Sequence, residues 1–287
     1  MELHVKRFFI TITLPAALLL LGGHALPQAH PPVTRAEMRV GRMQRATQNV
    51  PEASEYRLGR AVAARILTTY QLAQDPKLQL YINEVGQAVA RKSSRPDTFR
   101  GYHFAVLESL EPNAFACPGG IILITRGMLK LCGNEDEVAA ALAHEVAHVA
   151  HRDGLNSVVS SRWATVVAER RISAAKERGG RAAEMAALYE GSINDVFKTM
   201  VTNGYSRTAE WAADQEALRT LSRAGYNPQA LASLLAKMVA QEKRGVGIYR
   251  THPPTALRLA RVNAQVKDLK PEKIPEARER RFKEQKI

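Results

Sequence analysis

The stretch that decides the fold is Val138–Ala150, Val-Ala-Ala-Ala-Leu-Ala-His-Glu-Val-Ala-His-Val-Ala, in which His144 and His148 stand four residues apart. On an α-helix, residues four apart lie on one face, so the two imidazoles can converge on a single metal ion. Glu145 lies about 100° around the helix from His144, where its carboxylate can hold a water beside the metal. The alternative is a surface helix with two solvated histidines, and a third ligand downstream distinguishes the two.

A candidate third ligand lies in Tyr205–Asp214, a segment expected to be helical. Glu210 follows His148 by 62 residues, which allows a separate helix to pack against the first. Two histidines and one glutamate with an open position are a common catalytic zinc set. Asp214 is one turn beyond Glu210, where it can accept the N–H of a ligand imidazole and fix its tautomer. The alternative here is a surface helix with two exposed acids.

The first 25 residues have the layout of a secretory signal peptide. Lys6 and Arg7 precede an apolar run over 8–21, and Gly22, Gly23, His24 and Ala25 follow as a cleavage signal. The run is shorter than the about 20 apolar residues of a transmembrane helix. We therefore expect cleavage near Ala25 and a periplasmic or otherwise exported protein, with a retained anchor as the alternative.

The charge balance is strongly basic, with 41 Lys and Arg against 28 Asp and Glu and a formal net charge of +13. Such a surface attracts anionic lipid or polysaccharide, and nucleic acid is the other candidate partner. Export argues against nucleic acid, so we expect peripheral contact with an anionic membrane surface. The tail over 267–287 interleaves basic and acidic residues, which is typical of a solvated helix or a frayed end.

The apolar periodicity predicts a mainly helical α+β protein. Residues 26–50, with several prolines, are expected to form a linker, and residues 51–266 one catalytic domain. Two short β-rich runs are expected to form a small antiparallel sheet beside the helix that contains His144 and His148. Gly133-Asn134 is expected to cap this helix at its N-terminus. The expected helices cover 52–74, a stretch that starts at Asp75-Pro76, the helix with the two histidines, two stretches divided by Gly179-Gly180, 209–223, 229–243 and a stretch after Pro254; the expected strands are 102–107 and 121–125.

Cys117 and Cys132 are the two cysteines of the chain, and both are near the expected site in sequence. In an exported protein they can form a disulfide that closes a short loop. Alternatively, Cys117 can reach the metal as an inhibitory thiolate, because zinc binds sulfur well. The third alternative is that both are small, buried, apolar residues.

Four motifs in order resemble the HtpX and CaaX-prenyl-protease family of zinc metallopeptidases, over about residues 75–262. The similar segments are 113–127, 134–151, Ser206-Arg207 through Glu210 and Asp214, and Thr251-His252-Pro253-Pro254. The chain is most similar to the exported bacterial members that lack membrane helices. It departs from other relatives in having no membrane-spanning set, no long C-terminal helical-repeat domain, and Cys117 in place of an apolar residue.

This resemblance implies a zincin-like metallopeptidase fold and a role for each matching residue. His144, His148 and Glu210 would bind one zinc ion, with Glu145 as the general base and Asp214 as the partner of a ligand histidine. His252 would stabilise the oxyanion.

The resemblance also implies an edge strand at Asn113–Pro118 that receives an extended substrate by backbone pairing, a mode that needs little side-chain specificity. The substrate-binding residues would be Asn113, Ala114, Phe115 and Ala116. His151, one turn past His148, is expected to cap the helix or to pack rather than to bind metal.

The resulting prediction is a zinc-dependent endopeptidase of the bacterial cell envelope, acting on misfolded or envelope proteins or on peptides. One alternative is a zinc-containing, chaperone-like quality-control factor with little proteolysis. An intact Glu145 speaks against it, because binding alone does not require a general base. The other alternative is a basic surface-binding protein whose motif is accidental.

Overall fold

The computed structural model describes residues 50–158, 190–242, 252, 255–269 and 274–287. The predicted signal peptide (1–25) and all but the last residue of the predicted linker (26–50) lie outside these ranges, as do Thr251, Pro253 and Pro254. Within the described ranges, no helix is long and apolar enough to cross a membrane.

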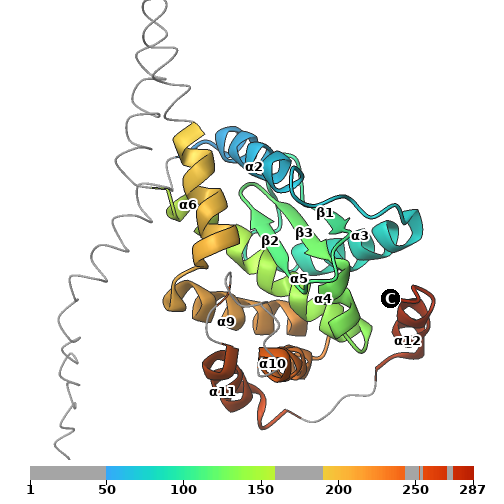
Figure 1. The fold of residues 1–287 in the computed structure, drawn as a ribbon. Helices are drawn as coiled ribbons and strands as arrows, with labels where there is room; N and C mark the ends of the chain where they lie inside the picture. Colours follow the sequence, from blue (N-terminus) through green and yellow to red (C-terminus); the bar gives the residue numbers. More distant parts are fainter. Residues whose placement is uncertain (1–49, 159–189, 243–251, 253–254, 270–273) are drawn as a thin grey trace, which may run out of the picture.

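The described chain is mainly helical, with one small sheet, as the sequence predicts (Figure 1). Residues 190–198 are helical and continue into a short π-helix, η1. In chain order the elements are α2 (Glu52–Ile66), α3 (Pro76–Ala90), β1 (His103–Leu107), β2 (Ala114–Cys117), β3 (Ile121–Thr125), α4 (Arg126–Leu131), α5 (Glu135–Ala150), α6 (Asp153–Asn156), η1 (Thr199–Asn203), α9 (Arg207–Ala224), α10 (Gln229–Glu242), α11 (Thr255–Val266) and α12 (Glu276–Lys283).

The sheet is mixed, with strand order β1-β3-β2. The expectation of an antiparallel sheet is correct for β2 and β3 and wrong for β1 and β3, which run parallel. The reason is the extra strand β2, which lies between β1 and β3 in the sequence. The chain reverses once before β2 and again at residues 118–120, so β3 runs in the same direction as β1. The turn needs glycine: Gly119 has φ 76°, and a Cβ there would lie 2.6 Å from the Cα of Tyr56.

The first helix is shorter than predicted and ends at Ile66 instead of residue 74. Beyond it, residues 71–73 extend alongside β1: Ala73 N–H donates to Val106 O at 2.9 Å, and Glu108 N–H donates to Gln71 O at 2.8 Å. Hydrogen bonds to the sheet therefore replace a last helical turn that the apolar spacing alone had favoured.

The sheet separates two hydrophobic clusters. Because side chains alternate along a strand, Ala114 and Ala116 belong to the larger cluster around α5, while Phe115 and Cys117 belong to the smaller cluster under α2. In Figure 1, α5 lies between the sheet and α9. The motif helix is thus the central element of the protein.

The sequence of α5 explains why it forms a buried helix. Asn134 caps it, accepting from Glu137 N–H at 2.9 Å, and three acids in the first turn favour the helix dipole. These acids are themselves buried. Glu137 is paired with Lys237 of α10, and Glu135 and Asp136 are bound by arginines of α12.

The C-terminal tail therefore differs from the expected solvated helix in one respect. It does form a helix, α12, but Arg278 and Arg281 reach across to the start of α5. Arg278 Nη1 lies 3.2 Å from Asp136 Oδ1, and Arg281 binds the carboxylate of Glu135, which is fully buried. This contact joins positions 146 residues apart, which sequence periodicity cannot detect.

Candidate active site

His144 and His148 lie one turn apart on the face of α5 that meets α9. Their Nε2 atoms are 3.1 Å apart, and the rings are nearly perpendicular, with an interplanar angle of 87°. Both side chains are buried. The helix thus aims the same nitrogen of each ring at one point.

Glu210 reaches that point from the first turn of α9. Ser206 caps this helix and accepts from Ala209 N–H at 3.2 Å, which fixes where the helix starts. The fully buried carboxylate places Oε2 3.4 Å from His144 Nε2 and Oε1 3.5 Å from His148 Nε2. The structure therefore brings Glu210 and the two motif histidines together, as their spacing predicts.

The donor set fits zinc. In a tetrahedral site with zinc–ligand bonds of about 2.0–2.1 Å, neighbouring ligand atoms lie about 3.4 Å apart. The Nε2 atoms of His144 and His148 are 3.1 Å apart, and the Glu210 carboxylate places Oε2 3.4 Å from the first nitrogen and Oε1 3.5 Å from the second, all close to that value. Imidazole nitrogen and carboxylate oxygen are the ligands of many catalytic zinc sites.

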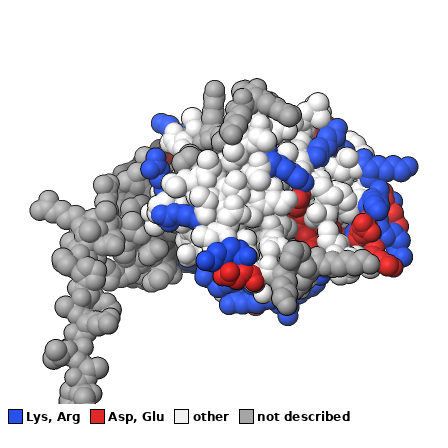
Figure 2. Space-filling view, turned by 90° about the horizontal axis from the view of Figure 1, so that it is seen from below, with Lys and Arg blue, Asp and Glu red and all other residues white. Residues whose placement is uncertain are grey.

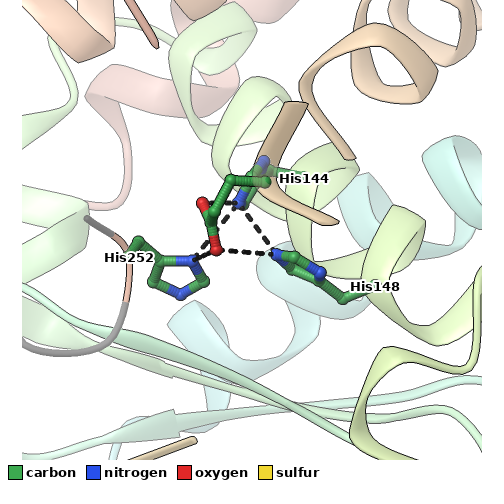
Figure 3. A group of neighbouring side chains, drawn as sticks. His144, His148 and His252 are labelled. Atoms are coloured by element: carbon green, nitrogen blue, oxygen red, sulfur yellow. Dashed lines mark hydrogen bonds and ion pairs between the residues drawn. The ribbon is translucent and has the colours of Figure 1, made fainter. Parts of the chain in front are cut away.

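His252 joins the same group (Figure 3). Its Nδ1 lies 2.8 Å from Glu210 Oε1 and 3.4 Å from His144 Nε2, and its Nε2 lies 3.7 Å from Glu145 Oε1. Nδ1 thus lies among the ligand atoms of the other three residues, and Nε2 faces the expected general base. This position suits a fourth protein ligand as well as the expected oxyanion donor.

Glu145 is buried beside the ligand group. Its Oε2 has no hydrogen-bond partner within the described residues, and its Oε1 faces His252 at 3.7 Å. A buried carboxylate oxygen without a donor can accept a proton from a water held between it and the metal position.

Asp214 contacts the ring nitrogen of His144 that points away from the site, with Oδ1 3.1 Å from Nδ1. Arg258 of α11 lies behind this pair, and it is a site residue that was not predicted from the sequence. Its guanidinium donates to Asp214 at 2.7 and 2.9 Å and lies 3.0 Å from Glu210 Oε2. Burial would raise the pKa of Asp214, but the charge of Arg258 outweighs it, so the net pKa is lowered.

The sequence did contain a signal for Arg258. Thr255, Arg258, Val262 and Val266 are the buried residues of α11, and their spacing of three and four places them on one face. An arginine on a helical face whose next two buried positions are valines predicts a buried carboxylate partner.

The expected substrate-binding strand is β2, at one edge of the sheet. Within the described part of the chain, no other strand pairs with its outer side. Ala114, Phe115 and Ala116 belong to the strand and are buried. Asn113 precedes it, and its side-chain oxygen accepts from Ala114 N–H at 2.9 Å. Backbone pairing with a substrate stays a prediction.

A pocket adjoins His144 and Glu145 between β2, α4, α5 and α10. His252 and Arg258 also border it. Its remaining lining is apolar and consists of Ala114, Met128, Ala141, Leu231, Leu234, Leu235 and Met238.

The cysteines and His151 have structural positions. Cys117 and Cys132 are buried and free, so the disulfide alternative is wrong for this structure. Burial raises the pKa of each thiol, with nearby Glu145 adding to the effect on Cys117. A neutral thiol is a poor metal ligand, which favours the alternative of two small apolar residues. His151 is the C-cap residue of α5, in agreement with its expected capping role.

Two histidines and a glutamate around one point, on packed helices beside a small sheet, define a zincin-like metallopeptidase. Residues 76–266 match the model of peptidase family M48, and the chain belongs to this family of zinc-dependent metallopeptidases. The family resemblance of the four motifs is thereby confirmed.

Individual relatives agree with this assignment. The chain is 26% identical to the beta-barrel assembly-enhancing protease of Escherichia coli K12, over 76% of this chain and 45% of that protein. It is 29% identical to the mitochondrial metalloendopeptidase OMA1 of Schizosaccharomyces pombe, over 66% and 54%. It is 28% identical to a protease HtpX homolog of Kineococcus radiotolerans, over 71% and 77%. The chain thus spans about half the length of the first two relatives.

Proposed function

We propose that this metallopeptidase is an endopeptidase of the bacterial cell envelope in which His144, His148 and Glu210 hold one zinc ion. The observation that carries the proposal is the convergence of these three ligand atoms beside a buried carboxylate oxygen of Glu145 that has no partner in the described chain. Zinc bound there would lower the pKa of a coordinated water and polarise the scissile carbonyl.

The surrounding side chains then have separate tasks. Glu145 takes a proton from the attacking water and passes it to the leaving amine. Asp214 holds Nδ1 of His144, so that Nε2 keeps its lone pair for the metal. His252 donates to the developing oxyanion when it is not a ligand, because its ring lies between the ligand group and Glu145.

For the substrate, we propose an extended peptide that pairs with the outer edge of β2 and places an apolar side chain in the adjoining pocket. The lining by Leu231, Leu234 and Met238 supports this choice, because burying an apolar side chain against apolar surface is favourable. Mass spectrometry of casein fragments should then show cuts next to large apolar residues. Cuts without any apolar preference would contradict the role of the pocket.

The location in the envelope is supported by the predicted signal peptide and by the basic net charge of +13. Figure 2 shows Lys and Arg spread around the edge of one face, with acidic residues beside some of them. A dispersed basic surface suits weak contact with an anionic membrane better than binding to nucleic acid. Misfolded or envelope proteins are the proposed natural substrates.

The test is casein digestion by the full chain, with and without a zinc chelator. We expect cleavage that the chelator abolishes and that added zinc restores. Cleavage that persists after the metal is removed would contradict the proposal. A zinc-bound protein that suppresses aggregation of unfolded casein without cutting it would favour the chaperone-like alternative, and a protein without zinc would favour the surface-binding one.

A further inference from the structure

His148 has a contact that the motif does not indicate. Its Nδ1 lies 2.8 Å from Oδ2 of Asp153, the first residue of α6. Its Nε2 is the nitrogen that faces His144 and Glu210. A carboxylate that accepts the proton of Nδ1 leaves the lone pair on Nε2, where a metal needs it. Asp153 therefore stands to His148 as Asp214 stands to His144.

Asp153 reaches this position because the chain bends sharply at Arg152. Arg152 has φ 57° and ψ 33°, a left-handed conformation that glycine adopts freely and that other residues rarely adopt. Among the described non-glycine residues, only Arg152 and Lys286 have positive φ. A strained residue next to a ligand partner indicates that the surroundings hold it there for a function.

The side chain of Arg152 shows what holds the bend. Its Nε lies 3.2 Å from Oε2 of Glu55, a carboxylate of α2 that is fully buried. The other oxygen of Glu55 accepts from Arg95 at 3.0 Å and from the N–H of Gly119 at 3.2 Å. A buried carboxylate needs such partners. Glu55 thus joins α2 and the turn between β2 and β3 to the bend that follows α5.

Tyr205 fixes the remaining freedom of the imidazole. Its ring stacks on that of His148, with centroids 4.3 Å apart and an interplanar angle of 28°. The imidazole is thus held in its plane by Asp153 and across its face by Tyr205.

We infer that Asp153 is a positioning residue of the metal site, fixing the tautomer and orientation of His148, and that the ion pair of Arg152 with Glu55 holds Asp153 in place. The inference rests on the proposed ligand set.

The test measures zinc affinity of the full chain by competition with a chelator of known affinity. We expect Asp153→Ala to weaken zinc binding about 10- to 100-fold, the usual effect of losing such a partner. Asp153→Asn should lose less, because the amide oxygen still accepts from Nδ1–H. The matched control is Asp268→Ala. Asp268 is exposed and follows the C-terminal end of α11, so this variant should bind zinc like the wild type. Wild-type affinity in Asp153→Ala would overturn the inference.

A double-mutant cycle tests the role of Arg152. Arg152→Ala alone should weaken zinc binding, and it should cause no further loss in the Asp153→Ala background, because both changes act through one contact. Additive losses, or wild-type affinity in Arg152→Ala, would overturn this part. Circular dichroism of the metal-free variants checks that each is folded.

The failure of this inference is distinct from failure of the proposed function. If the wild-type chain binds no zinc, the proposed metal site is wrong. If the wild type binds one zinc and Asp153→Ala binds it equally well, only the role of Asp153 is wrong.

Discussion

At the scale of single residues, the arrangement around the ligands depends on Arg258. It is 2% exposed and pairs with Asp214 and Glu210, which are 3% and 0% exposed. A buried carboxylate is costly without an opposite charge, so the Arg258 guanidinium, which contacts both Asp214 and Glu210, stabilises the two carboxylates beside each other.

Arg258→Met is therefore expected to lower the free energy of unfolding of the metal-free protein by about 3–5 kcal/mol, the usual cost of breaking a buried ion pair. Urea denaturation measures this change. The matched control is Arg261→Met on the same helix, because Arg261 is exposed and stacks on Trp211 at 3.2 Å. An exposed cation–π contact contributes about 0.5–1 kcal/mol. Equal losses in the two variants would show that Arg258 is not a buried anchor.

A site residue could be predicted from the sequence where its contacts lie within one helix. His144, Glu145 and His148 lie within one helical turn, so their common site follows from helix geometry alone. Asp153 is only five residues beyond His148, but its contact depends on the bend at Arg152, which no sequence pattern indicates for an arginine.

At the scale of elements, α12 stabilises the start of α5. Glu135 is fully buried at the N-terminus of α5, and Arg278 and Arg281 are the charges that meet it and Asp136. Replacing both arginines by alanine should lower the free energy of unfolding by about 2 kcal/mol, less than for a wholly buried pair because Arg281 is about half exposed.

Lys283→Ala on the same helix is the control, because Lys283 is exposed and, among the described residues, its ion pair is with Glu279 at 3.5 Å. Such a surface pair contributes about 0.3–0.5 kcal/mol. Chemical denaturation of the three proteins compares these values. If the double variant were as stable as the control, α12 would have no stabilising role.

The elements themselves were predictable where capping and periodicity agree. α3 starts at Asp75-Pro76 and Asn134 caps α5 as expected, and both Asp75 and Asn134 accept from the third residue of their helix. The direction of β1 relative to β3 was not predictable, because it depends on β2, which was expected only from the family resemblance. The end of the first helix was missed because residues 71–73 bond to the sheet, a contact between distant segments.

At the scale of the whole molecule, a metal held by α5 and α9 should tie these two helices together in the folded state only. A ligand that binds only the folded state stabilises it by about 2.7 kcal/mol when its free concentration is 100 times Kd. Zinc should therefore raise Tm of the chelator-treated protein by several degrees. Calorimetry with and without zinc measures the shift.

His144→Ala is the control for this measurement, because it removes one ligand. This variant should show no zinc-dependent shift in Tm and no stoichiometric zinc. A shift as large as that of the wild type would contradict the assignment of His144 as a ligand.

The central claim is that Glu145 moves the proton in a peptidase reaction at this site, and Glu145→Gln tests it most directly. Glutamine has nearly the same shape but cannot accept the proton, so the variant should bind one zinc per chain and show no cleavage of casein above background. Appreciable casein cleavage by zinc-loaded Glu145→Gln would contradict the account.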